Sequence, residues 1–287
     1  MSRSFSNASL LAAAASLLVV GAASAQLKIP RVSPGATVTQ TVGLTDVTVT
    51  YSRPGVKNRV IWGDLVPYDK PWRTGANEAT AFATSDEIQF GGQKLPAGTY
   101  SLYTIPGKGE WTVVLNSEKD LWGAYEVKPE KDVLRVKVKP TPAEHQEWMQ
   151  FSFEDLTPTT ANLVLRWEKL RVAVPIAADP SPKVLASCRA AMDTASAANW
   201  RTPLQASTFC LNNEVALEEG RKWIERSIAV EKNYSNLSLL ARWQARDGKK
   251  SDAIATAKQA IALAKQSKDR IDTIPTERLI ADWSTTK

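Results

Sequence analysis

Aromatic, basic and acidic side chains suited to binding gather in one irregular stretch, residues 53–80. Its repeated proline and glycine residues interrupt any regular helix or strand, which is typical of a binding loop or a heavily braced connection. An aromatic ring offers flat apolar contact, an arginine binds a carboxylate or a pair of hydroxyls, and an amide fixes orientation. The stretch therefore predicts a site for a small polar or glycan-like ligand. The candidate ligand-binding residues are Arg53, Trp62, Trp72, Arg73, Asn77 and Glu78, together with Trp122 and Tyr125 further along the chain.

The same residues also fit a purely structural role. Trp62 and Trp72 would then close the end of a folded core, and Arg73 would pair with Glu78 or Asp64 to tie the loop down. The segment that begins at residue 122 also has two alternative roles. It either supplies a second aromatic wall for a ligand or covers the edge of a sheet. The residue types alone leave both roles open.

The sequence lacks the residue sets of the common catalytic sites. A catalytic zinc site needs two or more histidines, or histidine with cysteine, but His145 is the one histidine. A serine triad would have to use it without a Gly-x-Ser-x-Gly elbow, and no phosphate-binding loop or dinucleotide fingerprint is present. We therefore predict no catalytic residue, no metal and no cofactor. The enzymatic alternative is a carbohydrate hydrolase in which Glu78 acts as acid and Asp64 or Glu126 as base or nucleophile, with the carboxyl groups ~5 to 9.5 Å apart.

Residues 1–25 have the features of a secretory signal peptide. Arg3 supplies a positive charge, residues 10–22 are small and apolar, and residues 23–25 fit the small-x-small cleavage pattern. The apolar run is shorter than the roughly 20 residues that span a bilayer, and no later segment is apolar enough to do so. We therefore expect an exported protein, periplasmic or secreted, that is not membrane-spanning.

Charge and cysteine content limit the partners and the covalent bonds. A net charge of +6 over 287 residues does not indicate a nucleic-acid binder, and an exported protein would rarely meet nucleic acid. Cys188 and Cys210 are the two cysteines. In an oxidising compartment they are candidates for one disulfide, although two buried free thiols fit as well.

Apolar and polar residues alternate with a period of two between residues 36 and 176. Val47, Val49 and Tyr51 alternate with polar residues, and the same pattern returns over residues 134–139. Many short strands with no helical pattern between them predict an all-β antiparallel sandwich or barrel-like domain over residues 26–176. Further strands are predicted at 79–84, 87–90, 99–105, 111–116, 149–153, 162–167 and 171–174.

The second half of the chain is predicted to be helical. Residues 177–182 resemble a linker, after which small and apolar residues recur three and four positions apart over residues 183–287. This region repeats at a constant offset of about 33 residues, as at Gly220 and Ala253. Because the offset is close to the roughly 34 residues of a tetratricopeptide helix pair, we predict a tetratricopeptide-like domain. Its helices would bind a protein partner, and the alternative role is that of a structural assembly factor.

Several motifs in order between residues 51 and 140 resemble a family of exported bacterial proteins that is known only as domain of unknown function 2911. The resemblance implies a β domain and export, and it brings no reaction, cofactor or site residue. The motifs are Tyr51-Ser52-Arg53-Pro54, Trp62-Gly63-Asp64-Leu65-Val66-Pro67-Tyr68, Trp72-Arg73-Thr74-Gly75-Ala76-Asn77-Glu78-Ala79-Thr80, Leu95-Pro96-Ala97-Gly98-Thr99-Tyr100, Trp111-Thr112-Val113 and Trp122-Gly123-Ala124-Tyr125.

Overall fold

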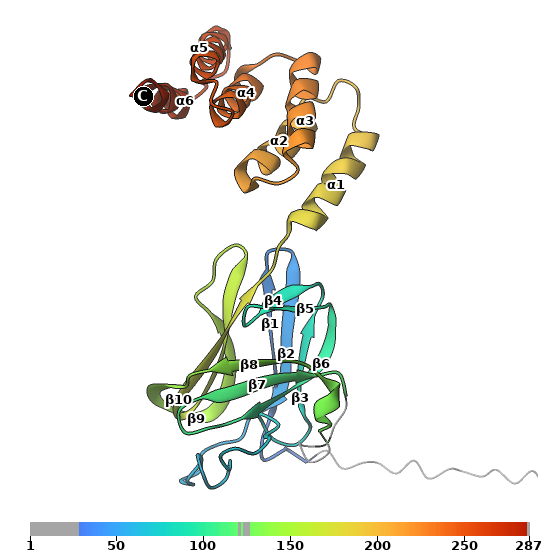
Figure 1. Cartoon of the computed structure of the whole chain (residues 1–287), viewed down its shortest axis with the longest axis vertical. Coiled ribbons are helices and arrows are strands. Elements are labelled where there is room, and N and C mark those ends of the chain that lie inside the picture. The colour runs from blue at the N-terminus through green and yellow to red at the C-terminus, as the bar shows by residue number, and fades with distance from the viewer. Residues whose placement is uncertain (1–28, 120–121, 123–126, 286–287) are drawn as a thin grey trace, which may run out of the picture. The chain divides into compact units, whose positions relative to one another are not determined.

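Two antiparallel sheets make up the first half of the fold. The computed structural model describes residues 29–119, 122 and 127–285, so the predicted signal peptide lies outside the described residues. Residues 1–32 and 33–287 are separate units, and every element below lies in the second. The strands are β1 (Gly35–Val42), β2 (Thr45–Ser52), β3 (Thr80–Thr84), β4 (Ile88–Phe90), β5 (Gln93–Leu95), β6 (Gly98–Ile105), β7 (Trp111–Asn116), β8 (Asp132–Val138), β9 (Thr141–Glu154) and β10 (Thr160–Ala177). One sheet has the strand order β1-β2-β3-β6-β7-β8 and the other β5-β4-β10-β9 (Figure 1).

The predicted period-two pattern places one face of each strand in a shared core. Val47, Val49 and Tyr51 of β2 are buried, whereas the threonines between them face outward. The apolar residues of β8 are buried in the same alternating way. Phe82 of β3 packs edge to face on Phe90 of β4, with ring centroids 5.1 Å apart, and so joins the two sheets. The prediction of an antiparallel β part followed by helices is confirmed.

Strand β10 differs from the prediction, which divided it into two short strands. It runs unbroken for 18 residues, but its register against β9 shifts twice, between Arg166 and Glu168 and between Glu168 and Leu170. Such bulges interrupt the alternation of buried and exposed residues without ending the strand. In the sequence, this interruption of the alternating pattern therefore resembles the end of one strand and the start of another.

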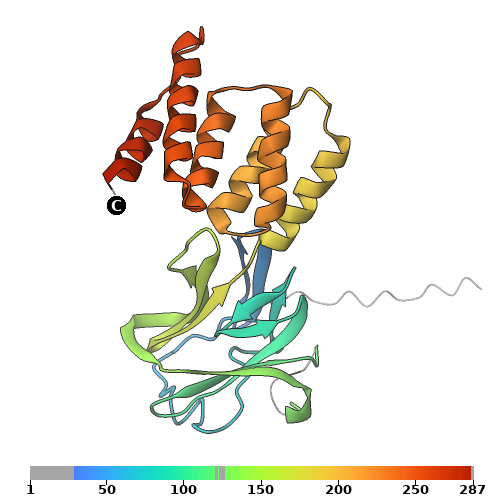
Figure 2. The same ribbon diagram turned by 45° about the horizontal axis from the view of Figure 1, so that its top comes forward.

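Six helices follow the sheets: α1 (Ser181–Thr194), α2 (Arg201–Asn213), α3 (Leu217–Val230), α4 (Tyr234–Arg246), α5 (Lys250–Gln266) and α6 (Ile274–Thr285). Helix α2 packs against α3, and α4 against α5 (Figure 2). Helix α4 begins and ends one repeat offset after α2, and α5 begins one offset after α3. This is the same offset that relates Gly220 to Ala253. The helix bounds thus follow the offset in the sequence. None of the described helices is both long and apolar enough to cross a membrane.

Small residues allow the helices of the repeat to approach closely. A Cβ atom at Gly220 would lie 2.6 Å from Cβ of Cys210 and 2.8 Å from the ring of Trp243. At the equivalent position of the second helix pair, Ala253 is fully buried. The indole of Trp243 donates a hydrogen bond to Oγ of buried Ser207 at 2.9 Å, which satisfies its one polar group inside the helical core.

A candidate ligand-binding groove

The beginning of the irregular stretch runs along the free edge of β9. The amide of Val56 donates to the carbonyl oxygen of Glu147 at 2.9 Å, and the amide of Met149 donates to that of Pro54 at 3.0 Å. Nε of Arg53 donates to the carbonyl oxygen of Met149 at 2.7 Å. These bonds cover backbone groups that an edge strand would otherwise leave unpaired. The contacts of Arg53 are therefore those of a structural brace.

Trp62 and Trp72 pack against the core between the sheets. The ring centroids of Trp62 and Trp111 are 5.0 Å apart, and Trp72 stacks on Trp167 at 5.7 Å with an interplanar angle of 18°. Trp111 and Trp167 are fully buried. Aromatic pairs of this kind contribute about 0.5–1.5 kcal/mol each beyond the area that they bury. This placement favours the packing interpretation for both predicted tryptophans.

Asn77 belongs to the turn that leads into β3. Its φ of 58° lies in the left-handed region, which asparagine tolerates better than most residues. Its Nδ2 donates to the carbonyl oxygen of Ser33 and to Oγ of Ser52, both at 3.2 Å. Nε of Arg73 is buried and has no hydrogen-bond partner among the described residues. Neither residue lines the groove described next.

Two of the predicted residues, Glu78 and Trp122, meet at a groove on the outer face of the six-stranded sheet. Its volume of about 240 Å³ is smaller than the roughly 300–1,000 Å³ of typical ligand pockets and suits a ligand the size of a single sugar ring. The side chain of Trp122 is 69% exposed, so its ring is available to a ligand. Tyr125 lies outside the described residues. The lining residues are Glu78, Ala79, Thr80, Ala81, Thr99, Tyr100, Ser101, Lys119 and Trp122.

Ser101 supplies a buried hydroxyl to this groove. On β6, Tyr100 and Leu102 belong to the core, so strand alternation places Ser101 on the outer face. Ser101 is only 5% exposed, and its Oγ has no hydrogen-bond partner among the described residues. A buried polar group left unpaired costs about 1–3 kcal/mol, which a ligand would recover if it displaced the atoms that shield this hydroxyl. The sequence pattern does not identify Ser101 as a site residue, because alternation shows which face of a strand a residue occupies and not what covers it.

The groove combines an aromatic face, a hydroxyl, a carboxylate and an ammonium group. Glu78 is the one acid among the described residues that line it, Asp64 is not among them, and Glu126 lies outside the described part of the chain. His145 lies on β9, in the other sheet. The described residues contain no group of three or more histidine, cysteine or acidic side chains that could hold a metal. This arrangement can bind and orient a polar ligand.

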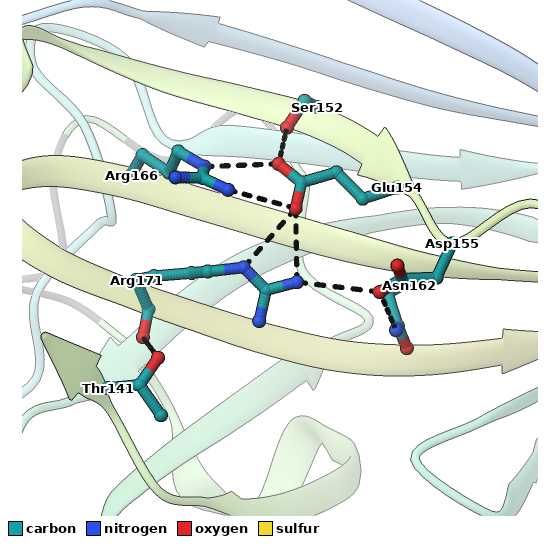
Figure 3. A network of polar contacts seen from close by, with 7 residues as sticks. All are labelled: Thr141, Ser152, Glu154, Asp155, Asn162, Arg166 and Arg171. Atoms are coloured by element: carbon teal, nitrogen blue, oxygen red, sulfur yellow. Dashed lines mark hydrogen bonds and ion pairs between the residues drawn. The ribbon is translucent and has the colours of Figure 1, made fainter. Parts of the chain in front are cut away.

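A second polar cluster lies on β9 and β10 and is centred on Glu154 (Figure 3). Nε and Nη2 of Arg166 donate to the two carboxylate oxygens of Glu154, both at 3.1 Å, and Arg171 donates to Oε2 at 3.2 and 3.0 Å. The bonds from Arg166, followed by those from Arg171 and Ser152, lower the pKa of Glu154 to about 2. Because the two arginines flank the register shifts of β10, this carboxylate holds the irregular part of the strand together.

Cys188 of α1 and Cys210 of α2 are both free thiols in the structure. Cys210 is fully buried, and Cys188 packs against the same helical core. Burial, together with neighbouring Cys188, raises the pKa of Cys210 to about 11. The structure thus has two free thiols, of which Cys210 is buried and Cys188 is partly buried.

Comparison with protein-family models finds a match, over residues 33–176, to the family described as Protein of unknown function (DUF2911). The matched range includes the described residues of the groove and excludes the helices. No curated protein and no solved structure matches the chain.

Proposed function

The chain belongs to the family of proteins of unknown function DUF2911, whose description assigns no activity, and from the groove we propose that it is an exported, non-catalytic binding protein of the cell envelope. Its ligand is a small polar or glycan-like molecule. Export rests on the signal-like residues 1–25.

The observation that carries this proposal is a groove whose lining includes both the unpaired hydroxyl of Ser101 and the exposed ring of Trp122. A sugar presents hydroxyls at its edge and C–H groups on its faces, so a sugar that displaces the atoms shielding the Ser101 hydroxyl can hydrogen-bond to it while its face covers Trp122. The groove that contains both residues is of sugar size. Lys119 and Glu78 at the same groove add polar groups that orient a ligand.

Replacement of Ser101 by alanine tests this role through two effects of opposite sign. Without ligand, Ser101→Ala removes an unpaired buried hydroxyl, so the variant should be as stable as the wild type or more stable by up to about 1 kcal/mol. Its affinity for a bound sugar should fall about tenfold, because one hydrogen bond worth about 1–1.5 kcal/mol is lost. Urea unfolding measures the first effect, and calorimetric titration with a panel of envelope sugars measures the second.

Trp122→Ala should weaken binding to the same sugars further, and Trp148→Ala is its matched control. Trp148 is also exposed, at 37%, but it lies on β9 and packs under Nζ of Lys57. Equal losses in the two tryptophan variants would contradict a specific role of Trp122. The absence of binding by every sugar in the panel would remove the support for the proposal.

The hydrolase alternative has less support from the geometry. It needs a second carboxylate near Glu78, and the described lining residues supply none. Glu78→Gln distinguishes the two functions, because in a hydrolase it should abolish turnover and leave the melting temperature nearly unchanged. In a binding protein no sugar-releasing activity should be detected before or after the substitution.

For the helices we propose a protein partner, on the basis of a second cavity. A cavity of about 360 Å³ lies at α2, α4 and α6, and its residues combine apolar side chains with two arginines. Such a surface suits an extended peptide segment. The lining residues are Leu211, Glu214, Arg242, Ala245, Arg246, Leu279 and Trp283.

A photo-crosslinking amino acid introduced at Trp283 tests this surface in cells. We expect a discrete crosslinked product from position 283 and none from position 258, an exposed lysine on α5. A product of the same size from both positions, or from neither, would contradict the proposal.

A further inference from the structure

The groove opens onto a regular field of hydroxyl groups on the outer face of the six-stranded sheet. Strand pairing places residues of β1, β2, β3 and β6 in rows that cross the four strands, and one row ends at Ser101 inside the groove. That row consists of Thr37, Thr50, Ala81 and Ser101, and its neighbour consists of Thr39, Thr48, Ala83 and Thr99.

The threonines of both rows remain able to bind a ligand. Oγ1 of Thr37 lies 3.2 Å from Oγ1 of Thr50, and the hydroxyls of Thr39 and Thr48 are 2.9 Å apart. A hydroxyl has one donor and two acceptor lone pairs, so each bonded pair keeps a donor and several lone pairs for another molecule. Thr37, Thr39 and Thr50 are exposed.

The two rows carry only short, uncharged side chains between the edge strand and the groove. Ala81 and Ala83 have no side-chain atom beyond Cβ, so the side chains at these two positions form no barrier between the threonines and β6. The row beyond Thr39 and Thr48 contains a charged residue, Asp46, whose Oδ1 accepts a hydrogen bond from Thr41 at 2.6 Å. Neither row contains a charged residue, which favours a neutral ligand over an anionic one.

The field is also longer than the groove. Neighbouring strands lie about 4.8 Å apart, so four strands place Thr37 about 14 Å from Ser101. A groove of about 240 Å³ holds roughly one sugar unit. A linear chain of sugars with one unit beside Trp122 would therefore extend its next units over the threonine rows.

We propose that the ligand is a linear, uncharged glycan of three or more units, with one unit in the groove and the others on the threonine rows. This inference rests on the proposed binding function and names its ligand class. The groove supplies the aromatic and buried contacts for one unit, and the threonines supply hydrogen bonds to the hydroxyls of the units that follow.

The test compares oligomers of increasing length in the full chain. The probes are linear 1,4-linked glucose oligomers of one to six units and the corresponding uronate oligomers, measured by saturation-transfer NMR and calorimetry. For the wild type we expect affinity for the neutral series to rise at least about tenfold from one unit to four. The double variant Thr37→Val/Thr50→Val keeps the shape and strand preference of the side chains. It should bind the monomer like the wild type and lose most of the rise with length.

Thr112→Val is the matched control, because Thr112 lies on β7 of the same sheet, outside both rows. It should behave like the wild type at every length. If monomer and tetramer bind the wild type equally, or if the double variant keeps the rise, the threonine rows are not part of the site, while groove binding stands. Tighter binding of the uronate oligomers than of the neutral oligomers would contradict the proposal that the ligand is uncharged. If no oligomer binds, including the monomer, the proposed function fails together with this inference.

Discussion

Replacement of Glu154 by glutamine should remove a large part of the acid sensitivity of the β part. The carboxylate has a pKa of about 2 in the folded protein, compared with an ordinary value of 4.5, because hydrogen bonds from Arg166 and then Arg171 stabilise its charged form. A lowering of this size corresponds to about 3 kcal/mol of folding free energy at neutral pH. The side chain is 26% exposed, and solvent screening reduces the expected effect to about 2 kcal/mol.

The sign of the pH dependence follows from the lowered pKa. The stabilisation is present in full above pH 4.5, where the carboxyl group of the unfolded chain is also ionised, and it is lost as the pH falls from about 4.5 to about 2. The Glu154→Gln variant has no carboxyl group at this position, so its stability does not fall as that group is protonated. The free energies of unfolding of wild type and variant should therefore differ by about 2 kcal/mol at pH 7 and converge near pH 2 to 3.

Urea unfolding followed by tryptophan fluorescence at pH 7, 5, 4 and 3 measures this convergence. Glu144→Gln serves as the control for the loss of one negative charge, because Glu144 is an exposed glutamate on the same strand. Its stability curve should run parallel to that of the wild type. A difference between wild type and Glu154→Gln that is the same at pH 7 and pH 3 would refute the assignment of the lowered pKa to the arginine bonds.

Three further predictions concern packing and burial. Gly91→Ala should lower the free energy of unfolding by at least about 2 kcal/mol, because φ is +59° and the new methyl group would overlap a valine side chain of β8. Gly92→Ala, at φ +79° in open space, should cost less in the same urea assay, and equal costs would contradict the overlap. Ser207→Ala should cost about 1–3 kcal/mol by leaving the buried indole N–H of Trp243 unpaired, and an unchanged urea midpoint would count against this bond. Iodoacetamide at pH 8 should modify Cys210 far more slowly in the folded protein than in urea, because burial raises the pKa of this thiol to about 11. Mass spectrometry measures the two rates of modification, and equal rates would contradict the prediction.

The irregular stretch shows how far residue types can predict a site. Density of aromatic and polar side chains identified residues 53–80, but the structure assigns those side chains to different tasks. Arg53 covers the edge of β9, and Trp62 packs on buried Trp111. Glu78, at the end of the stretch, lines the groove. Residue type indicates what a side chain can bind, whereas its role depends on whether the fold presents it to solvent or to another strand.

The sequence by itself determined the features that depend on local spacing. Alternation with a period of two identified most strands, and the constant offset between repeats located the paired helices, because each pattern reflects the geometry of one element or one repeat. Tertiary structure alone decided the place of the site. Ser101 on β6 and Trp122 beyond β7 meet Glu78 because β3 and β6 are neighbours in the sheet. Strand order is set by contacts between residues distant in the chain, and no local pattern records it.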